Sequence, residues 1–453
     1  MHAENQKSQG TSKYVLISFC MDSNMKVIAI VIIILLPIEN LYLQFSDVKI
    51  RFAEILGVLV FITFFPKYAF EKRILLPPKS KYLIYFFIIS SVSLIYSNVG
   101  PIKYGIIYQF HQIIQFICII SVYYIFRSLN SQFVFEEVEK KIFYFFDLIL
   151  LYGLIQVFFY NLLGWDIRFG MDSWRTSIIS YRQDIIDPLE DVFTNAPWMR
   201  PPSVFAEPVY LGLFCTWIFT ISLSQYIKGS LAFVWKYRIV LSMILIVFVA
   251  SRAAILSISI ITLYLFYFSQ KSKIKIIITT LIISIFLILL SIFFNINIIN
   301  GFLKGRFDEN ATNADPRMLM FAGQITGFLN SPLFGNGRGM TRVLSDKVMP
   351  LIFQPDQPTG GWSFWLTLLY DSGIAGFMSL IIYFVSLFGI TKLDKHKINK
   401  SESHIYFLGL VSIMITGIFF GPLTGGIFWL ALLMFYLSSM NNKIINKPKV
   451  TRI

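Results

Sequence analysis

The sequence predicts an all-α, polytopic membrane protein with about twelve transmembrane helices. Of its 453 residues, 56% are hydrophobic and 14% are charged, whereas a soluble domain carries roughly 25% charged residues. The apolar residues form continuous runs of about 20, which is the length of a helix that crosses a ~30 Å hydrocarbon core. Because these runs do not alternate between apolar and polar residues, they fit helices rather than membrane strands.

The apolar runs divide the chain into a polar tail, a membrane region and a second tail. We expect residues 1–24 and 441–453 to be cytoplasmic tails and residues 25–440 to form one transmembrane domain. No small-residue cleavage site follows the first run, so we interpret it as a retained span. The expected spans are 25–44, 50–66, 82–97, 104–126, 142–163, 206–226, 233–250, 252–269, 275–296, 364–390, 404–420 and 425–440.

The positions of the basic residues indicate the topology. With both termini inside, more than half of the 39 Lys and Arg residues fall in short inside segments, as the positive-inside rule predicts. This topology depends on residues 239–268, which carry a single charged residue, Arg252. One helix of that length would be ~45 Å long, too long for an untilted span. We therefore expect two spans that meet at an outer turn at Ser251-Arg252.

Two polar segments, 164–204 and 297–362, are expected to be large outer loops. The second is too long to be a simple connector, because structureless loops beyond ~12–15 residues are usually functional or disordered. Within it, Asp315 and Pro316 fit the N-cap and first position of a helix. We expect this helix to lie along the membrane surface, since one apolar stripe contains Met318, Phe321, Ile325 and Phe328.

The outer segments favour arginine over lysine, and the inside segments favour lysine. A planar guanidinium can bind a phosphate or carboxylate through two parallel hydrogen bonds, so this bias indicates an anionic ligand outside. The alternative is pairing with acidic residues of the same loops, or, for Arg252, extension to the lipid headgroups. The candidate anion-binding residues are Arg200, Arg252, Arg317 and Arg338.

Four further positions are candidates for the same site. Gly335 and Gly337 lie in Ser331-Pro332-Leu333-Phe334-Gly335-Asn336-Gly337-Arg338-Gly339, where glycines can aim backbone N–H groups at an anion or simply form a turn. Glu207 stands at an outer helix start, where it is either a proton acceptor for an attacking hydroxyl or a residue that complements the helix dipole. Asp371, just inside an apolar run, is the fourth candidate.

No metal or cofactor is indicated. The three cysteines show neither a zinc spacing nor a disulfide framework, and the four histidines form no cluster in the sequence. The formal charge of +14 does not indicate nucleic-acid binding, because the basic residues are distributed along membrane loops. The expected partner at this stage is membrane lipid.

Several motifs, in their order along the chain, resemble the O-antigen polymerase and ligase superfamily that contains the Wzy-type polymerases. They are Arg-x-x-Ser-x-Phe-x-Glu-Pro-x-x-x-Gly at 200–212, Ser-Arg at 251–252, Arg317, Ser-Pro-Leu-Phe-Gly-Asn-Gly at 331–337 and Asp-Ser-Gly-Ile-Ala-Gly at 371–376. The resemblance covers roughly residues 25–440. It implies a GT-C-like helical fold in a bacterial inner membrane, with both large loops in the periplasm.

The resemblance also implies a metal-independent glycosyltransferase that acts on undecaprenyl-diphosphate-linked oligosaccharides, with a chain-length co-polymerase as a partner. A polymerase moves the growing glycan onto a new lipid-linked repeat unit, and a ligase moves it onto the lipid A core. Ligases have a histidine before the span that follows the large loop; here that place reads Thr359-Gly360-Gly361-Trp362-Ser363, which favours a polymerase. A lipid-linked-oligosaccharide flippase or another transporter is the alternative from a different class.

Overall fold

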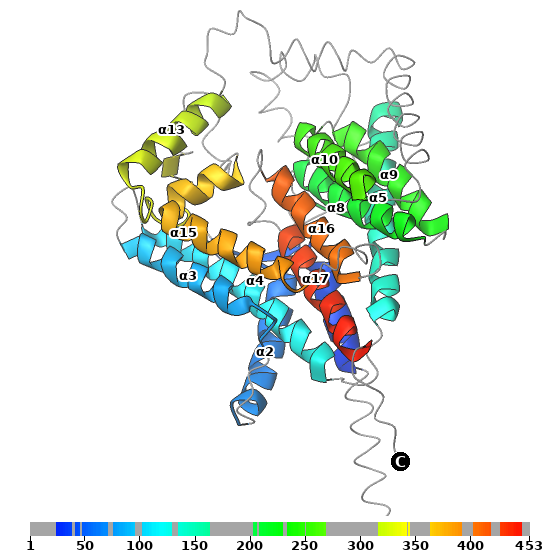
Figure 1. Ribbon diagram of the computed structural model, residues 1–453, viewed down its shortest axis with the longest axis horizontal. Coiled ribbons are helices and arrows are strands. Elements are labelled where there is room, and N and C mark those ends of the chain that lie inside the picture. Colours follow the sequence, from blue (N-terminus) through cyan, green and yellow to red (C-terminus); the bar gives the residue numbers. More distant parts are fainter. Residues whose placement is uncertain are drawn as a thin grey trace, which may run out of the picture.

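The computed structural model describes fifteen segments of the chain: 24–38, 41–45, 48–70, 76–95, 102–128, 135–163, 203–205, 208–229, 233–249, 251–268, 316–341, 343–344, 363–391, 402–417 and 426–445. They are almost entirely helical (Figure 1). An apolar helix, Asn24–Leu35, comes first. The labelled helices are α2 (Phe52–Phe70), α3 (Ser80–Ile95), α4 (Ile102–Ser128), α5 (Phe135–Leu163), α8 (Pro208–Lys228), α9 (Phe233–Val249), α10 (Arg252–Phe268), α13 (Pro316–Asn330), α15 (Phe364–Phe388), α16 (Glu402–Thr416) and α17 (Gly426–Ile445).

The helices have the composition of membrane spans. Within the described residues, four are long and apolar enough to cross a bilayer: Gly105–Ser128, Phe135–Phe159, Val209–Lys228 and Phe364–Phe388. Six shorter apolar helices accompany them. The chain is therefore a helical protein with several helices that could span a membrane. The expected span at 275–296 lies outside the described residues, and the total of about twelve stays a prediction.

The predicted break in the 239–268 region is present. Helix α9 ends at Val249 and α10 begins at Arg252. Between them, the Ser251 hydroxyl oxygen accepts a hydrogen bond from the Ala254 N–H at 3.3 Å, which makes Ser251 the N-cap of α10. The sequence thus forms two helices here because a capping residue supplies an acceptor for N–H groups at the start of the second.

Replacement of Ser251 is expected to weaken this helix start. Ser251→Ala removes a buried N-cap, so the free energy of unfolding should fall by about 0.5–2 kcal/mol. Ser251→Asp keeps an acceptor and should lose less. Detergent-titrated unfolding of the purified variants measures both, and equal losses for alanine and aspartate would contradict the capping role.

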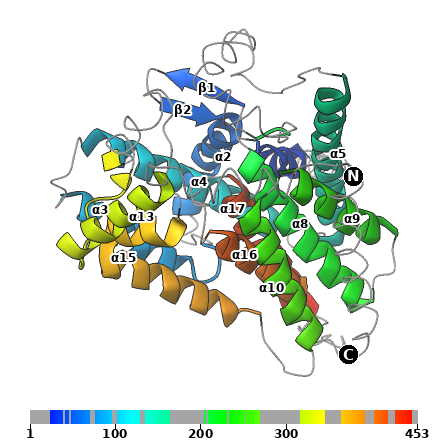
Figure 2. The same cartoon turned by 90° about the horizontal axis from the view of Figure 1, so that it is seen from above.

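The expected helix over 25–44 is wrong beyond residue 35. The first helix ends at Leu35, and Pro37 explains this because proline disfavours helical backbone at the residue before it and cannot donate a helical hydrogen bond. The chain then forms a hairpin of β1 (Tyr42–Phe45) and β2 (Val48–Arg51), in which Phe45 pairs with Val48 and Tyr42 with Arg51. Figure 2 shows the hairpin beside the start of α2.

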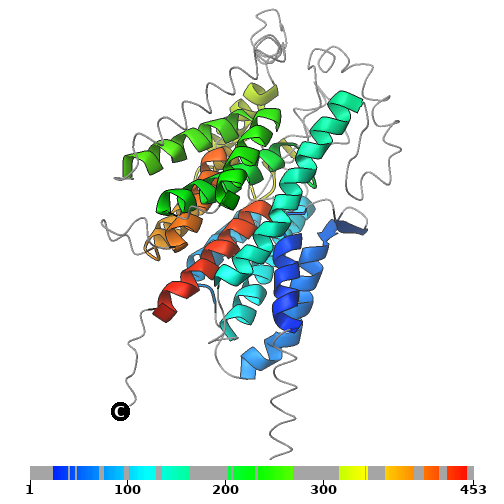
Figure 3. The same ribbon diagram turned by 90° about the vertical axis from the view of Figure 1, so that its right-hand side faces the viewer.

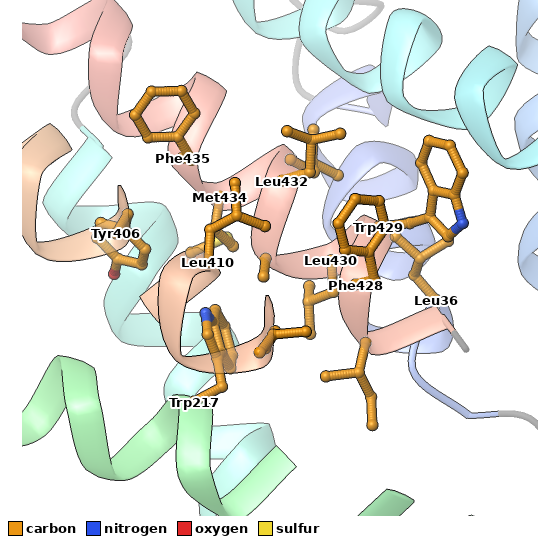
Figure 4. Packing of buried hydrophobic residues seen from close by; sticks show 14 of the residues in the cluster. Leu36, Trp217, Tyr406, Leu410, Phe428, Trp429, Leu430, Leu432, Met434 and Phe435 are labelled. Carbon is orange, nitrogen blue, oxygen red and sulfur yellow. The ribbon is translucent and has the colours of Figure 1, made fainter. Parts of the chain in front are cut away.

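The helices form two groups. In the first, α4 contacts α2, α3 and α17, and α15 lies against α3 and α13. In the second, α8 contacts α9, α10 and α16. In Figure 3, α5 and α17 lie next to one another, where the two groups meet. Large buried side chains fill the interior: Trp217 of α8 lies against α16, and Trp429 lies on the side of α17 that is near Leu36 (Figure 4).

Candidate functional site

Helix α15 is broken where the predicted site residue Asp371 lies. Gly373 has φ 62° and ψ −166°, a conformation outside the helical region that glycine adopts without steric cost. A broken helix frees backbone groups, and in an apolar environment these groups must find partners. At this break, the partners come from residues 331–341, which contain the glycine-rich motif 331–339 noted in the sequence.

The 331–341 segment bonds to both halves of the broken helix. The N–H groups of Asn336 and Gly337 donate to the carbonyl oxygens of Tyr370 (2.8 Å) and Asp371 (3.0 Å) at the end of the first half. The carbonyl oxygens of Pro332 and Leu333 accept from Ile374 (2.8 Å) and Ala375 (3.1 Å) at the start of the second half. The segment therefore supplies hydrogen-bond partners on both sides of the break, as an apolar environment requires.

Glycine is required at both Gly335 and Gly373 because the main chains of the 331–341 segment and α15 touch at these positions. A Cβ on Gly335 (φ 72°) would lie 2.6 Å from the Asp371 carbonyl carbon, and one on Gly373 would lie 2.5 Å from the Leu333 oxygen. No flexible side chain stands between these atoms, so neither position has room for any other residue without moving main chain.

The 331–341 segment also binds the Asp371 carboxylate. Its Oδ2 accepts from the Gly339 N–H at 2.9 Å, and its Oδ1 accepts from the Thr341 N–H at 3.0 Å and the Thr341 hydroxyl at 2.7 Å. Two N–H groups, two residues apart, and one hydroxyl thus converge on one anion. Here the arrangement is filled by a side chain of the same protein.

Arg338 lies beside this carboxylate, with 1% of its side chain exposed. Its Nη1 is 3.8 Å from Asp371 Oδ2, and its Nη2 donates to Gln112 Oε1 at 3.3 Å. The guanidinium carbon lies 5.3 Å from the Phe86 ring centroid and 5.1 Å from that of Tyr108. Arg338 Nε has no hydrogen-bond partner in the described part of the chain. We call residues 331–341, which include Arg338, together with Asp371 the clasp.

The clasp changes the interpretation of four predicted site residues. Arg338 and Asp371 are brought together as predicted members of one site. Gly337 N–H donates to Asp371, however, and Gly335 N–H donates to the Ser331 oxygen at 2.9 Å, so neither offers a free donor to a diphosphate. Both glycine N–H groups bond to main-chain oxygens within the clasp, which corresponds to the alternative that this motif simply forms a turn.

Helix α4 contributes a polar face that sequence analysis missed. Ile106, Phe110 and Ile113 are exposed on one side of this helix, at 58%, 51% and 37%. The opposite side, at the i, i+3, i+4 and i+7 positions, faces the helices packed against α4 and consists of Tyr108, His111, Gln112 and Gln115. Polar residues that face the interior of an apolar bundle are typical of functional positions in membrane proteins.

A buried carboxylate, that of Glu54, contacts this face at His111 and Gln115. Glu54, the third residue of α2, is fully buried. It accepts from the Arg51 N–H at 3.0 Å and from Gln115 Nε2 at 3.1 Å, and its Oε2 lies 3.4 Å from His111 Nδ1. The available signals were an isolated acid near the start of an apolar run and a histidine between glutamines at helical spacing.

The other predicted site residues are placed only in part. Arg252 is the first residue of α10 and Arg317 the second residue of α13, and both side chains lie outside the described part of the structure. Arg200 and Glu207 lie outside the described residues. Whether these four side chains share one site with the clasp stays a prediction.

Helix α13 begins at Pro316, as predicted. Its protein-facing side is formed by Met320 and Gln324, both buried, and Gln324 Nε2 donates to Thr367 Oγ1 at 2.9 Å. Ile325 and Leu329 are 46% and 67% exposed. The exposed apolar residues are what a helix on a membrane surface would present to lipid, and that location stays a prediction.

No protein-family model matches this sequence, and no curated protein matches it either.

Proposed function

We propose that this chain is an O-antigen or related surface-polysaccharide polymerase in a bacterial inner membrane. It would transfer a glycan chain from undecaprenyl diphosphate onto a lipid-linked repeat unit at the periplasmic face. The observation that carries the proposal is the clasp: the motifs 331–337 and 371–376, which carry part of the family resemblance, lie far apart in the sequence and bond to each other through main chain. Their joint geometry supports the interpretation that the two motifs form one structural unit rather than two independent turns.

The proposed chemistry needs charge neutralisation more than covalent catalysis. The acceptor hydroxyl attacks the anomeric carbon, the bond from that carbon to the phosphate oxygen breaks, and undecaprenyl diphosphate leaves with the electron pair. Guanidinium groups stabilise this leaving group electrostatically. In the proposal, Arg252, Arg317 and Arg200 serve this purpose, and the clasp fixes the C-terminal end of α13 against α15. A chain-length co-polymerase remains a proposed partner.

Three outcomes of a gene deletion distinguish the candidate functions. Loss of a polymerase leaves surface glycan of a single repeat unit. Loss of a ligase removes surface glycan while lipid-linked polymer accumulates. Loss of a flippase leaves lipid-linked repeat units on the cytoplasmic side. Full-length glycan in the deletion strain would overturn all three.

Arg252→Ala and Arg317→Ala, each expressed in the deletion strain, are expected to collapse the glycan ladder toward one repeat, because each removes a charge that stabilises the leaving diphosphate. Loss of one such donor lowers a rate by about 10²–10³. Lys141→Ala is the matched control, since Lys141 forms an exposed ion pair with Glu137 at 3.1 Å. Membrane abundance is measured for every variant, and normal ladders at normal abundance would contradict the arginine roles.

A transporter is the second candidate, because discontinuous helices such as α15 also occur in secondary transporters. In those proteins the freed backbone faces the substrate or ion, whereas here the freed groups bond to residues 331–341. Purified protein in vesicles separates the two: lengthening of added lipid-linked oligosaccharides supports the polymerase, and movement of them across the bilayer without lengthening supports the transporter.

A further inference from the structure

We propose that His111 is the general base of the glycosyl transfer and that Glu54 positions it. This inference rests on the proposed function, whose chemistry requires a group that takes the proton of the acceptor hydroxyl. Sequence analysis assigned that step to Glu207, which lies outside the described residues. The pair of Glu54 and His111 is a second candidate, and the structure describes both side chains.

The contacts of Glu54 leave its carboxylate fixed in place. One oxygen, Oε1, accepts from Gln115, and the other, Oε2, accepts from the Arg51 N–H and faces His111 Nδ1. A carboxylate held in this way accepts a hydrogen bond from the Nδ1–H of a neutral imidazole. It thereby fixes the tautomer whose Nε2 carries the lone pair, and it stabilises the imidazolium that forms when Nε2 takes a proton.

The imidazole is more accessible than the carboxylate. In the described part of the chain, 25% of the His111 side chain is exposed, whereas the Glu54 side chain is fully buried. The carboxylate is thus shielded and the imidazole is reachable. In such a pair, the buried carboxylate orients the imidazole, and the imidazole exchanges the proton with the substrate.

Unpartnered polar atoms lie along the same face of α4 and on Arg338, which donates to Gln112 of that face. Gln112 Nε2, Gln115 Oε1 and Arg338 Nε are buried and have no hydrogen-bond partner in the described part of the chain. Buried polar atoms are normally satisfied, so a group of them calls for a ligand or ordered water. Because sugar hydroxyls both donate and accept, they match this mixture of amide and guanidinium atoms better than an apolar ligand does.

The proposed step balances without a co-reactant. His111 Nε2 removes the proton from the acceptor hydroxyl as the oxygen bonds to the anomeric carbon, and the diphosphate departs with the electrons of the broken bond. The proton on the imidazole then passes to solvent or to the leaving diphosphate. The charged and titratable groups around the imidazole are Glu54 and Arg51, with Tyr108, Arg338 and Asp371 further along the polar face.

The test uses purified full-length protein in vesicles, with lipid-linked oligosaccharides extracted from the deletion strain as the probe. His111→Gln is expected to lower kcat by about 10²–10⁴ with little change in KM. Glu54→Gln, which removes the charge that stabilises the imidazolium, should show a smaller loss of kcat. Thr63→Ala, on the exposed side of α2, is the matched control.

The outcomes separate this inference from the function on which it rests. If the wild-type protein lengthens no oligosaccharide, the proposed function fails. If the wild type does so and His111→Gln keeps its kcat, the pair only holds α2 to α4 and the inference is overturned. A loss of kcat in Glu207→Gln that His111→Gln does not share overturns it too. If His111→Gln does not fold, an unchanged kcat in Glu54→Gln overturns the positioning role on which the inference depends.

Discussion

Asp371→Ala is expected to destabilise the protein more than Arg338→Ala, although the two residues form one buried pair. Asp371 accepts three hydrogen bonds from Gly339 and Thr341, so its loss leaves these donors without an acceptor. It also leaves the buried Arg338 guanidinium without a counter-charge. Removal of one partner from a buried ion pair typically costs about 3–5 kcal/mol. Arg338→Ala leaves a carboxylate that three donors still satisfy, so its cost should fall below that range.

The same asymmetry predicts the effect of a neutral isostere. In Asp371→Asn, one amide oxygen can replace Oδ1 as the acceptor for Thr341, but the amide NH₂ then faces the Gly339 N–H, and two donors meet. We expect Asp371→Asn to fall between the two alanine variants. Unfolding free energies from detergent titration measure the series, with Lys141→Ala as a surface control that should cost less than about 1 kcal/mol. A larger loss for Arg338→Ala than for Asp371→Ala would show that the ion pair, and not the hydrogen-bonded carboxylate, holds the clasp.

Helix positions were predictable because their signals are local. Runs of apolar residues fix where helices lie, and capping residues such as Ser251 and Pro316 fix where two of them begin. The hairpin at 42–51 was also within reach. Pro37 stops the helix, and alternation from Leu43 to Arg51 around Ser46-Asp47 is a hairpin pattern. A long apolar run concealed both signals.

The candidate site was less predictable because its contacts are distant in the sequence. The glycines of the 331–341 segment indicate unusual backbone and close approach, but not which backbone approaches. Only the fold shows that Gly335 meets the break at Gly373. Glu54 and His111 are likewise brought together by the packing of α2 on α4. Their residue types were visible, and their pairing was not.

Gly335→Ala is expected to destabilise the protein more than alanine at two other glycines, and the comparison separates the causes. Gly335 combines a positive φ with main-chain atoms of Asp371, Ser372 and Gly373 at 2.6 Å from a Cβ. Gly229 also has a positive φ (102°), but nothing lies within 4 Å. Gly389 has φ −63° and an ordinary contact at 3.4 Å.

The three alanine variants should therefore form a graded series. Gly389→Ala should leave the free energy of unfolding within about 0.5 kcal/mol of the original value. Gly229→Ala should cost about 1–2 kcal/mol from backbone strain alone. Gly335→Ala adds overpacking of about 1–3 kcal/mol to that strain, with no side chain that can yield. Size-exclusion profiles and unfolding of the purified variants give the order. If Gly335→Ala matched Gly229→Ala, the 331–341 segment would be able to move away from α15 at no cost, and the clasp would not constrain the broken helix.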